Sequence, residues 1–301
     1  MWINDYKESG WFKSLLKEAY YVIRFVFLFV KNGGRVQTVL FYPEFPLFKT
    51  ELNSILRRSG YNITNNPKLK HDGVVAWEDT TFRPDYPLLH QLGSNEQIVN
   101  MGCDDISKRR VESIQQQIFG YSLGVDPRRH TGACVRKSNL NGRHNETEIV
   151  DCPIARKEPE SIYQRLVNNS MGDGNVEDVR VHICGQKIVC VTIRHKPEKL
   201  RFYGDFHASV DEPSKWLSAE EIALVLRFAS AMGLDYGEMD TLRDADDGRL
   251  YIVDVNNTPY SAPPSAGLSR KDRATALQLG RVAFVEAFLR QGVPLVENRE
   301  S

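Results

Sequence analysis

The sequence predicts an α/β fold combined with α+β parts, arranged as three small lobes. Near the amino terminus a strand at residues 37–42, a helix at 48–59 and a strand at 74–77 follow one another. This order is typical of a β-α-β unit. Later in the chain, pairs of short strands alternate with amphipathic helices, which indicates α+β lobes. A chain of 301 residues can bury enough apolar surface to support several such lobes.

Helix caps and apolar spacing predict the remaining elements. Ser218 and Glu221 form a capping box before an apolar-periodic run that Gly233 ends. Further helices are expected at 107–119 and 272–291, and strands at 133–137, 149–153, 163–167, 179–183 and 187–194. We therefore expect four segments: an apolar helix at 1–33, a β-α-β domain at 34–103, a central lobe at 104–166 and a carboxy-terminal lobe at 167–301.

The amino-terminal segment is very apolar between residues 19 and 30, interrupted by Arg24. This run is too short to cross a bilayer as a helix, so no transmembrane span is expected. A buried helix is the favoured interpretation. Contact of residues 11–30 with a membrane surface or a partner is the alternative, because Trp11 and Phe12 precede the run.

Composition excludes some classes of function. Lysine plus arginine equals aspartate plus glutamate, at 39 each, so no overall basic charge attracts nucleic acid. The five cysteines contain no C-x-x-C pair, which favours a cytoplasmic location and no zinc. Histidines such as His182 and His195 lack the spacing of a zinc site, and we expect them to be structural or to face substrate.

The most informative motif lies near the carboxyl end. The run from Leu250 to Asn256 reads as a strand, on which Asp254 and Asn256 point to the same face. Residues 246–248 supply a turn that brings Asp240 of the preceding strand onto the same surface. Two carboxylates and an amide oxygen suit Mg²⁺. A solvated strand face is the structural alternative.

Two lysines are candidates for holding phosphate. Lys108 stands in the first turn of a predicted helix, and Lys137 ends a strand before a polar loop. An ammonium group near a helix amino terminus attracts phosphate oxygens. For either lysine taken alone, a solvated surface residue is the favoured interpretation.

Together these motifs resemble the ATP-grasp superfamily, most closely its ribosomal-protein glutamate-ligase-like and D-alanine–D-alanine-ligase-like branches. The resemblance covers about residues 100–266 and is carried by short pieces in the same order. These are 105–108, Lys137, 163–166, 178–180, Arg194, Arg201, and the stretch 233–259 that ends in D-V-N-N-T-P.

The resemblance implies a small β-α-β amino-terminal lobe followed by central and carboxy-terminal lobes that sandwich ATP. It also implies roles for individual residues. Nucleotide contacts fall on Lys108, Lys137, Tyr163, Gln164, Arg165, Leu166 and Asp178, with the main chain of 164–166 reading the adenine. Stabilisation of the transferring phosphoryl group falls on Arg180, Arg194 and Arg201. The metal ligands are Asp240, Asp254 and Asn256, for two Mg²⁺ ions, with Mn²⁺ as a substitute.

The chain also departs from this pattern. Asp254 stands where the superfamily usually has glutamate, and Tyr260 follows Pro259 where glycine is frequent. The second departure leaves the acceptor substrate open.

We expect an ATP- and Mg²⁺-dependent ligase that joins a carboxylate to an amine through an acyl phosphate, with a small molecule or a peptide as acceptor. A kinase acting on a sugar or polyol hydroxyl is the first alternative, and a nucleotide-binding scaffold without turnover is the second. The oligomeric state is left open.

Overall fold

The computed structural model describes residues 36–94, 96–143, 146–202, 207–260 and 267–289, with scattered positions between 15 and 34. Most of the predicted apolar helix at 1–33 therefore lies outside the described residues, and its role stays a prediction. The described positions in this segment include exposed apolar side chains such as Ile23 and Val30. Among the described helices, none combines the length and apolar character needed to cross a membrane.

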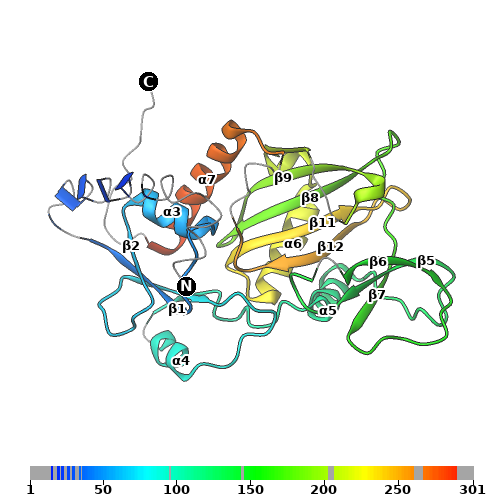
Figure 1. Ribbon diagram of the computed structural model, residues 1–301, viewed down its shortest axis with the longest axis horizontal. Helices are drawn as coiled ribbons and strands as arrows, with labels where there is room; N and C mark the ends of the chain where they lie inside the picture. Colours follow the sequence, from blue (N-terminus) through cyan, green and yellow to red (C-terminus); the bar gives the residue numbers. More distant parts are fainter. Residues whose placement is uncertain are drawn as a thin grey trace.

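The first sheet is parallel and has the strand order β2-β1-β3-β4 (Figure 1). Its strands are β1 (Thr38–Pro43), β2 (Asn62–Thr64), β3 (Gly73–Trp77) and β4 (Ile98–Val99). Helix α3 (Glu51–Ser59) connects β1 to β2, a short strand that was not predicted, and the predicted second strand of the β-α-β unit is β3, which pairs in parallel with β1. Helix α4 (Pro87–Gly93) precedes β4. The helix buries Leu52, Ile55 and Leu56 and ends at Gly60, whose φ of 83° is left-handed.

The second sheet is antiparallel, three-stranded and small. Its order is β6-β5-β7, and it stands at the opposite end of the molecule from the parallel sheet (Figure 1). Its strands are β5 (Gly132–Ser138), β6 (Glu148–Cys152) and β7 (Ser161–Arg165). Strand β7 begins and ends two residues earlier than predicted, because its pairing with β5 runs from Ser161 to Arg165.

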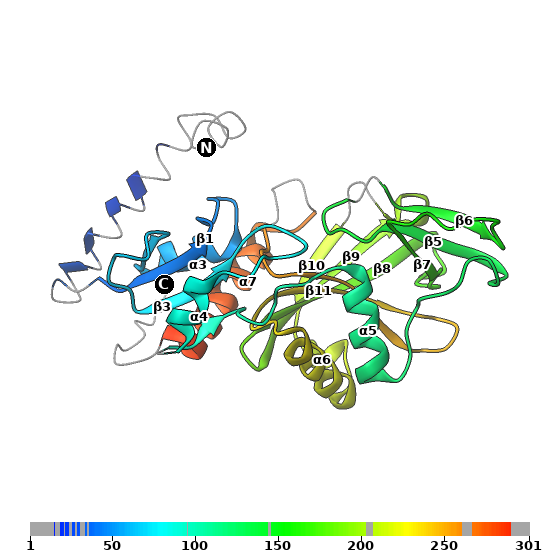
Figure 2. The same cartoon turned by 90° about the horizontal axis from the view of Figure 1, so that it is seen from below.

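The third sheet is antiparallel and forms the centre of the molecule, with the order β10-β9-β8-β11-β12. Its strands are β8 (Asn175–Cys184), β9 (Lys187–Pro197), β10 (His207–Asp211), β11 (Tyr236–Arg243) and β12 (Leu250–Asn256). Helices α5 (Lys108–Phe119) and α6 (Ala219–Met232) cover one face (Figure 2). Side chains such as Val181, Met239 and Phe228 are fully buried between this face and the helices.

Helix α6 shows how local sequence sets the limits of an element. The side chain of Ser218 accepts a hydrogen bond from the Glu221 amide, and the Glu221 carboxylate accepts one from the Ser218 amide, so the predicted capping box is present. Gly233 ends the helix at φ 67°. A Cβ atom there would lie 2.3 Å from the Gly102 carbonyl carbon, so this position requires glycine for close packing as well.

The carboxy-terminal helix returns to the amino-terminal lobe. Helix α7 (Arg270–Phe284), followed by a π-helical turn at Val285–Leu289, packs against α3 and against β8, β9 and β10. Phe284 contacts Tyr236 edge-on, with ring centroids 5.4 Å apart. The helix begins two residues before the predicted range of 272–291, and its regular α-helical part ends at Phe284, while residues 290 and 291 lie outside the described residues. It links two lobes rather than covering one.

A buried asparagine holds the parallel sheet against the central one. Asn100 follows β4, is 0 % exposed and has φ 59°. Its side-chain oxygen accepts from the amides of Asp235 and Tyr236, and its side-chain nitrogen donates to the carbonyls of Tyr236 and Asn257. The same junction is closed by the Glu51 amide, which donates to Pro259. These bonds place the start of α3 beside the end of β12.

Candidate functional site

The uncovered face of the central sheet is polar because its side chains alternate with the apolar ones. Asp240 on β11 pairs in register with Asp254 on β12 and with Arg180 on β8. Residues directly opposite each other in an antiparallel pair share a face. The two carboxylates predicted for metal binding therefore lie side by side, as expected from the hairpin.

A β-bulge changes the alternation at this point. The register between β11 and β12 shifts between Asp240 and Thr241, which leaves Val253 without an opposite residue. Val253 and Asp254 both line the cavity described next, although they are neighbours in the chain. Bulges redirect side chains in this way.

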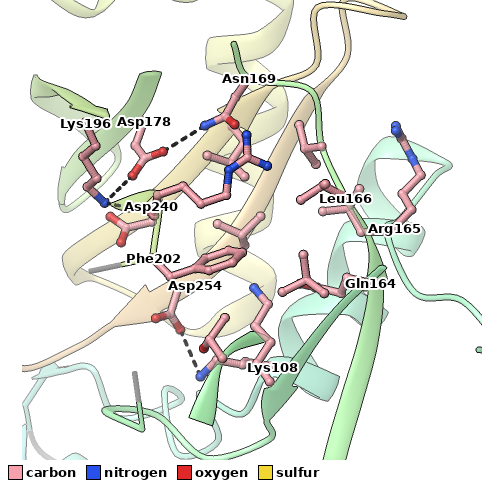
Figure 3. A pocket seen from close by; sticks show the side chains of 18 of the residues that line it. Lys108, Gln164, Arg165, Leu166, Asn169, Asp178, Lys196, Phe202, Asp240 and Asp254 are labelled. Atoms are coloured by element: carbon pink, nitrogen blue, oxygen red, sulfur yellow. Dashed lines mark hydrogen bonds and ion pairs between the residues drawn. The ribbon is translucent and has the colours of Figure 1, made fainter. Parts of the chain in front are cut away.

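A cavity of about 310 Å³ lies between this polar face, β5 and β7 (Figure 3). All the predicted site residues line it except Tyr163 and Asn256. They are Lys108, Lys137, Gln164, Arg165, Leu166, Asp178, Arg180, Arg194, Arg201, Asp240 and Asp254. Apolar side chains complete the lining. Among them are Val135 on β5, Leu123 in the segment between α5 and β5, and Val167 in the segment after β7.

Two arginines hold Asp240. Arg180 binds it with two parallel bonds, Nε to Oδ1 at 2.7 Å and Nη2 to Oδ2 at 3.0 Å, and Arg194 Nη2 lies 2.9 Å from Oδ1. Burial would raise the pKa of Asp240, but the charges of the two arginines hold it well below its usual range. Asp240 is thus a fixed anion between two cations.

A second ion pair lies on the same face of the sheet, between β8 and β9. Lys196 Nζ is 2.7 Å from Asp178 Oδ2, and the side-chain amide of Asn169 donates to Asp178 Oδ1 at 3.1 Å. Asp178 was predicted from the resemblance, whereas Lys196 and Asn169 were not. Lys196 lies two residues after Arg194 on β9, so the alternation would have indicated it had the predicted strand extended to 197 instead of ending at 194.

Two lysines approach from the opposite wall of the cavity. Lys108 begins α5, its Nζ donates to the Leu140 carbonyl at 2.9 Å, and it lies 3.8 Å from Asp254 Oδ1. Burial lowers the pKa of the half-buried Lys137 to about 8; attraction from Asp254 acts against this shift, and repulsion from Lys108 adds to it. The cavity therefore presents ammonium groups opposite carboxylates.

The predicted adenine segment borders the cavity along β7. The side chain of Gln164 donates to Glu112 on α5. The side chain of Arg165 points away from the other labelled residues (Figure 3). It stacks on Tyr251 and pairs with Asp244 Oδ2 at 2.5 Å. The side chain of Arg165 thus links β7 to β12. The main chain of this segment is therefore the part that is available to contact a base.

The remaining predicted residues point elsewhere. Tyr163 lines a neighbouring cavity, and its hydroxyl accepts a hydrogen bond from the Glu158 amide. Asn256 shares the face of Asp254, but its side-chain oxygen accepts from the Thr258 amide at 3.0 Å. Phe202, which was not predicted, borders the cavity between the polar face and β7 (Figure 3).

The donor set at β11 and β12 fits a hard divalent cation. Asp240 and Asp254 are carboxylates opposite each other at the cavity wall, and Asn256, which carries an amide oxygen, lies on the same strand face outside the lining of the cavity. Mg²⁺ prefers one or two carboxylates together with phosphate oxygens and water. These three residues therefore have the chemistry that such an ion requires.

Comparison with known proteins identifies the fold. The chain has the ATP-grasp fold, and the resemblance found in the sequence is confirmed at this level. The ATP-grasp ligase PsnB, solved with a phosphomimetic variant of a minimal precursor, Mg and ADP, superposes with a TM-score of 0.54 over 84% of this chain and 99% of that one, at 14% identity. D-alanine–D-alanine ligase from Bacillus anthracis superposes with a TM-score of 0.52 over 84% and 97%, also at 14% identity.

Sequence comparison is more restricted. No model of a protein family matches the chain. A probable alpha-L-glutamate ligase of Sodalis glossinidius (strain morsitans) is 32% identical over 126 residues, which is 42% of this chain and 40% of that protein. The match thus spans less than half of the curated relative.

Proposed function

We propose that the chain is an ATP- and Mg²⁺-dependent ligase that joins a carboxylate to an amine through an acyl phosphate. The observation that carries this proposal is the cavity in which Asp240 and Asp254 face Lys108 and Lys137. Phosphoryl transfer depends chiefly on positioning and on neutralising charge, and this cavity contains groups for both. The curated relative and the structural neighbours are named as ligases, which supports this reaction over other uses of the fold.

Each wall of the cavity has a role in the proposed reaction. The main chain of 164–166 would read adenine against apolar side chains such as Leu166. Lys108 and Lys137 would hold the phosphates, and Arg201, with Arg180 and Arg194, would stabilise charge on the transferring group. Asp240, Asp254 and Asn256 would hold Mg²⁺, which when bound screens the charge of the triphosphate. A reaction that uses ATP fits the cytoplasmic location expected from the sequence.

The reaction requires no nucleophilic side chain. A carboxylate oxygen of the first substrate attacks the γ-phosphorus, and the bond to the β-phosphate oxygen breaks to release ADP. The amine nitrogen then attacks the acyl carbon, phosphate leaves with the bonding electron pair, and the amine loses a proton to solvent. The protein contributes by holding both substrates in line and by excluding water.

Product analysis tests the proposal. The chain is incubated with Mg-ATP, a set of carboxylates that includes L-glutamate, D-alanine and an acidic peptide, and an amine. ADP and free phosphate are expected in equal amounts, in a yield that depends on both substrates. Hydroxylamine in place of the amine is expected to trap the acyl phosphate as a hydroxamate.

Two outcomes would contradict it. ADP accompanied by a phosphorylated product and no free phosphate would indicate a kinase. Tight binding of Mg-ATP without turnover of any acceptor would indicate a scaffold. A peptide belongs in the set because PsnB was solved with a precursor peptide.

A further inference from the structure

A second cluster of ligating side chains lies where the amino-terminal lobe meets the polar face. It consists of Glu51, the first residue of α3, His182 on β8 and Glu238 on β11. One ligating atom from each lies within 4.8 Å of the other two. His182 Nδ1 is 3.4 Å from Glu238 Oε1. Two carboxylates and an imidazole from three elements therefore converge on one point.

Each of these groups is oriented by a neighbour that uses its other polar atom. The Tyr236 hydroxyl donates to Glu51 Oε2 at 3.2 Å, and Arg180 Nη1 donates to Glu238 Oε2 at 2.8 Å. His182 Nε2 lies 2.8 Å from Thr192 Oγ1, which leaves Nδ1 for the cluster. Metal-binding imidazoles and carboxylates in proteins are usually oriented by outer hydrogen bonds of this kind.

The two carboxylates of the cluster share one neighbouring cation, the guanidinium group of Arg180. Burial and the charge of Glu238 raise the pKa of Glu51 to about 8, since two carboxylates at this distance repel each other. Burial lowers the pKa of His182, so the imidazole is in the neutral form that coordinates metals. Glu238 is 4 % exposed and shares Arg180 with Asp240, which already occupies two of the guanidinium donors.

We infer that Glu51, His182 and Glu238 bind a divalent transition-metal cation, of which Zn²⁺ and Mn²⁺ are examples. An imidazole nitrogen in the ligand set favours such ions over Mg²⁺. The site is separate from the proposed nucleotide metal site, because it uses none of Asp240, Asp254 and Asn256. This inference does not rest on the proposed ligase reaction.

The bound cation would join two lobes. Glu51 belongs to the lobe of the parallel sheet, whereas His182 and Glu238 belong to the central sheet. The backbone already holds Glu51 there, since its amide donates to Pro259 at 3.0 Å. An ion at this point would link the two lobes next to Asp240, which lies two residues after Glu238 on β11.

Calorimetry without nucleotide tests the site. The full chain is stripped of metal and titrated with Zn²⁺, and one equivalent is expected to bind. Glu51→Gln and His182→Ala are each expected to weaken binding at least tenfold. Co²⁺ in place of Zn²⁺ adds a visible absorption band that reports coordination directly, and the band is expected to shift in both variants.

His195→Ala is the matched control. His195 Nε2 pairs with Glu177 Oε2 at 3.0 Å between β9 and β8 of the same sheet, but the described residues place no third ligand beside this pair. This variant is expected to bind Zn²⁺ like the unsubstituted chain. If His182→Ala fails to fold, the conservative Glu51→Gln variant still decides the matter. Absence of a bound equivalent, or full affinity in Glu51→Gln, overturns the inference whether or not the chain is a ligase.

Discussion

The two faces of the central sheet come from the same strands and differ in their chemistry. On one face Val181, Ile193 and Met239 are buried against α5 and α6. On the other, Arg180 and Asp240 form a two-bond ion pair at the wall of the cavity. Because side chains alternate along a strand, residues that are neighbours in the chain point to opposite faces of the sheet. The comparison shows that one face packs the core and the other carries the charged groups of the proposed reaction.

The polar face is itself divided between a locked carboxylate and a less constrained one. Asp240 is held by Arg180 and Arg194. Asp254 accepts from the Val255 amide at 3.2 Å and lies 3.8 Å from Lys108. Asp254 is thus the carboxylate that can reach a bound cation with less rearrangement of its neighbours.

The largest expected effect comes from Asp254→Asn, which removes a charge from the polar face. We expect kcat to fall by about 100- to 1,000-fold, the size of loss seen when one preorganised electrostatic contact is removed. The midpoint of thermal unfolding should stay within a few degrees. Steady-state kinetics with saturating Mg²⁺ measures the loss.

Asp211→Asn is the control for that variant. Asp211 lies on edge strand β10 of the same sheet and pairs with Lys215 away from the cavity. We expect unchanged kcat. Full activity in Asp254→Asn at saturating Mg²⁺ would remove Asp254 from the metal assignment.

The next effect concerns pH and Lys137, whose pKa is lowered to about 8. A phosphate contact needs the protonated form, so kcat/KM for ATP should fall about tenfold per pH unit above 8. Lys137→Met should lower kcat/KM by about 10- to 100-fold, the value of one charged hydrogen bond, and should flatten this pH profile. Lys187→Met, at the exposed start of β9, is the control and should keep the profile.

Stability should respond to the same group with the opposite sign. In the unfolded chain the pKa returns to its ordinary value of 10.5, so unfolding takes up a proton between pH 8 and 10.5. The contribution of Lys137 to the free energy of unfolding therefore rises across this window while activity falls. If Lys137→Met loses the pH dependence of both kcat/KM and the free energy of unfolding, Lys137 is the group that titrates. If kcat/KM keeps its pH dependence, Lys137 is not that group.

The smallest effect is expected on the apolar face. Ile193→Val removes one buried methylene group next to Arg194 in the chain, and should lower the free energy of unfolding by about 0.5–1.5 kcal/mol. The kcat of the folded enzyme should not change. Denaturant unfolding and kinetics on the same preparation check this. A fall in kcat at unchanged stability would show that the two faces are not separable.

Much of the fold could be predicted because its signals are local. The capping box at Ser218 and the stop at Gly233 depend on neighbouring residues, and both are present. The pairing of Asp240 with Asp254 follows from strand alternation across one hairpin. Lys196 was missed for a related reason, since the limits of a strand are set by its partner rather than by its own residues.

The sequence by itself determined the β-α-β unit and the helix limits, because period and caps act over a few residues. Its short motifs carried the resemblance that implied the ATP-grasp fold and most of the predicted residues that line the cavity. The tertiary structure alone decided the bulge at Val253, the docking of α7 on α3 and the meeting of Glu51 with His182 and Glu238. These features join residues that are distant in the chain or depend on packing between lobes. No local pattern predicts such a contact, because the contact stabilises the protein only after both surfaces have formed.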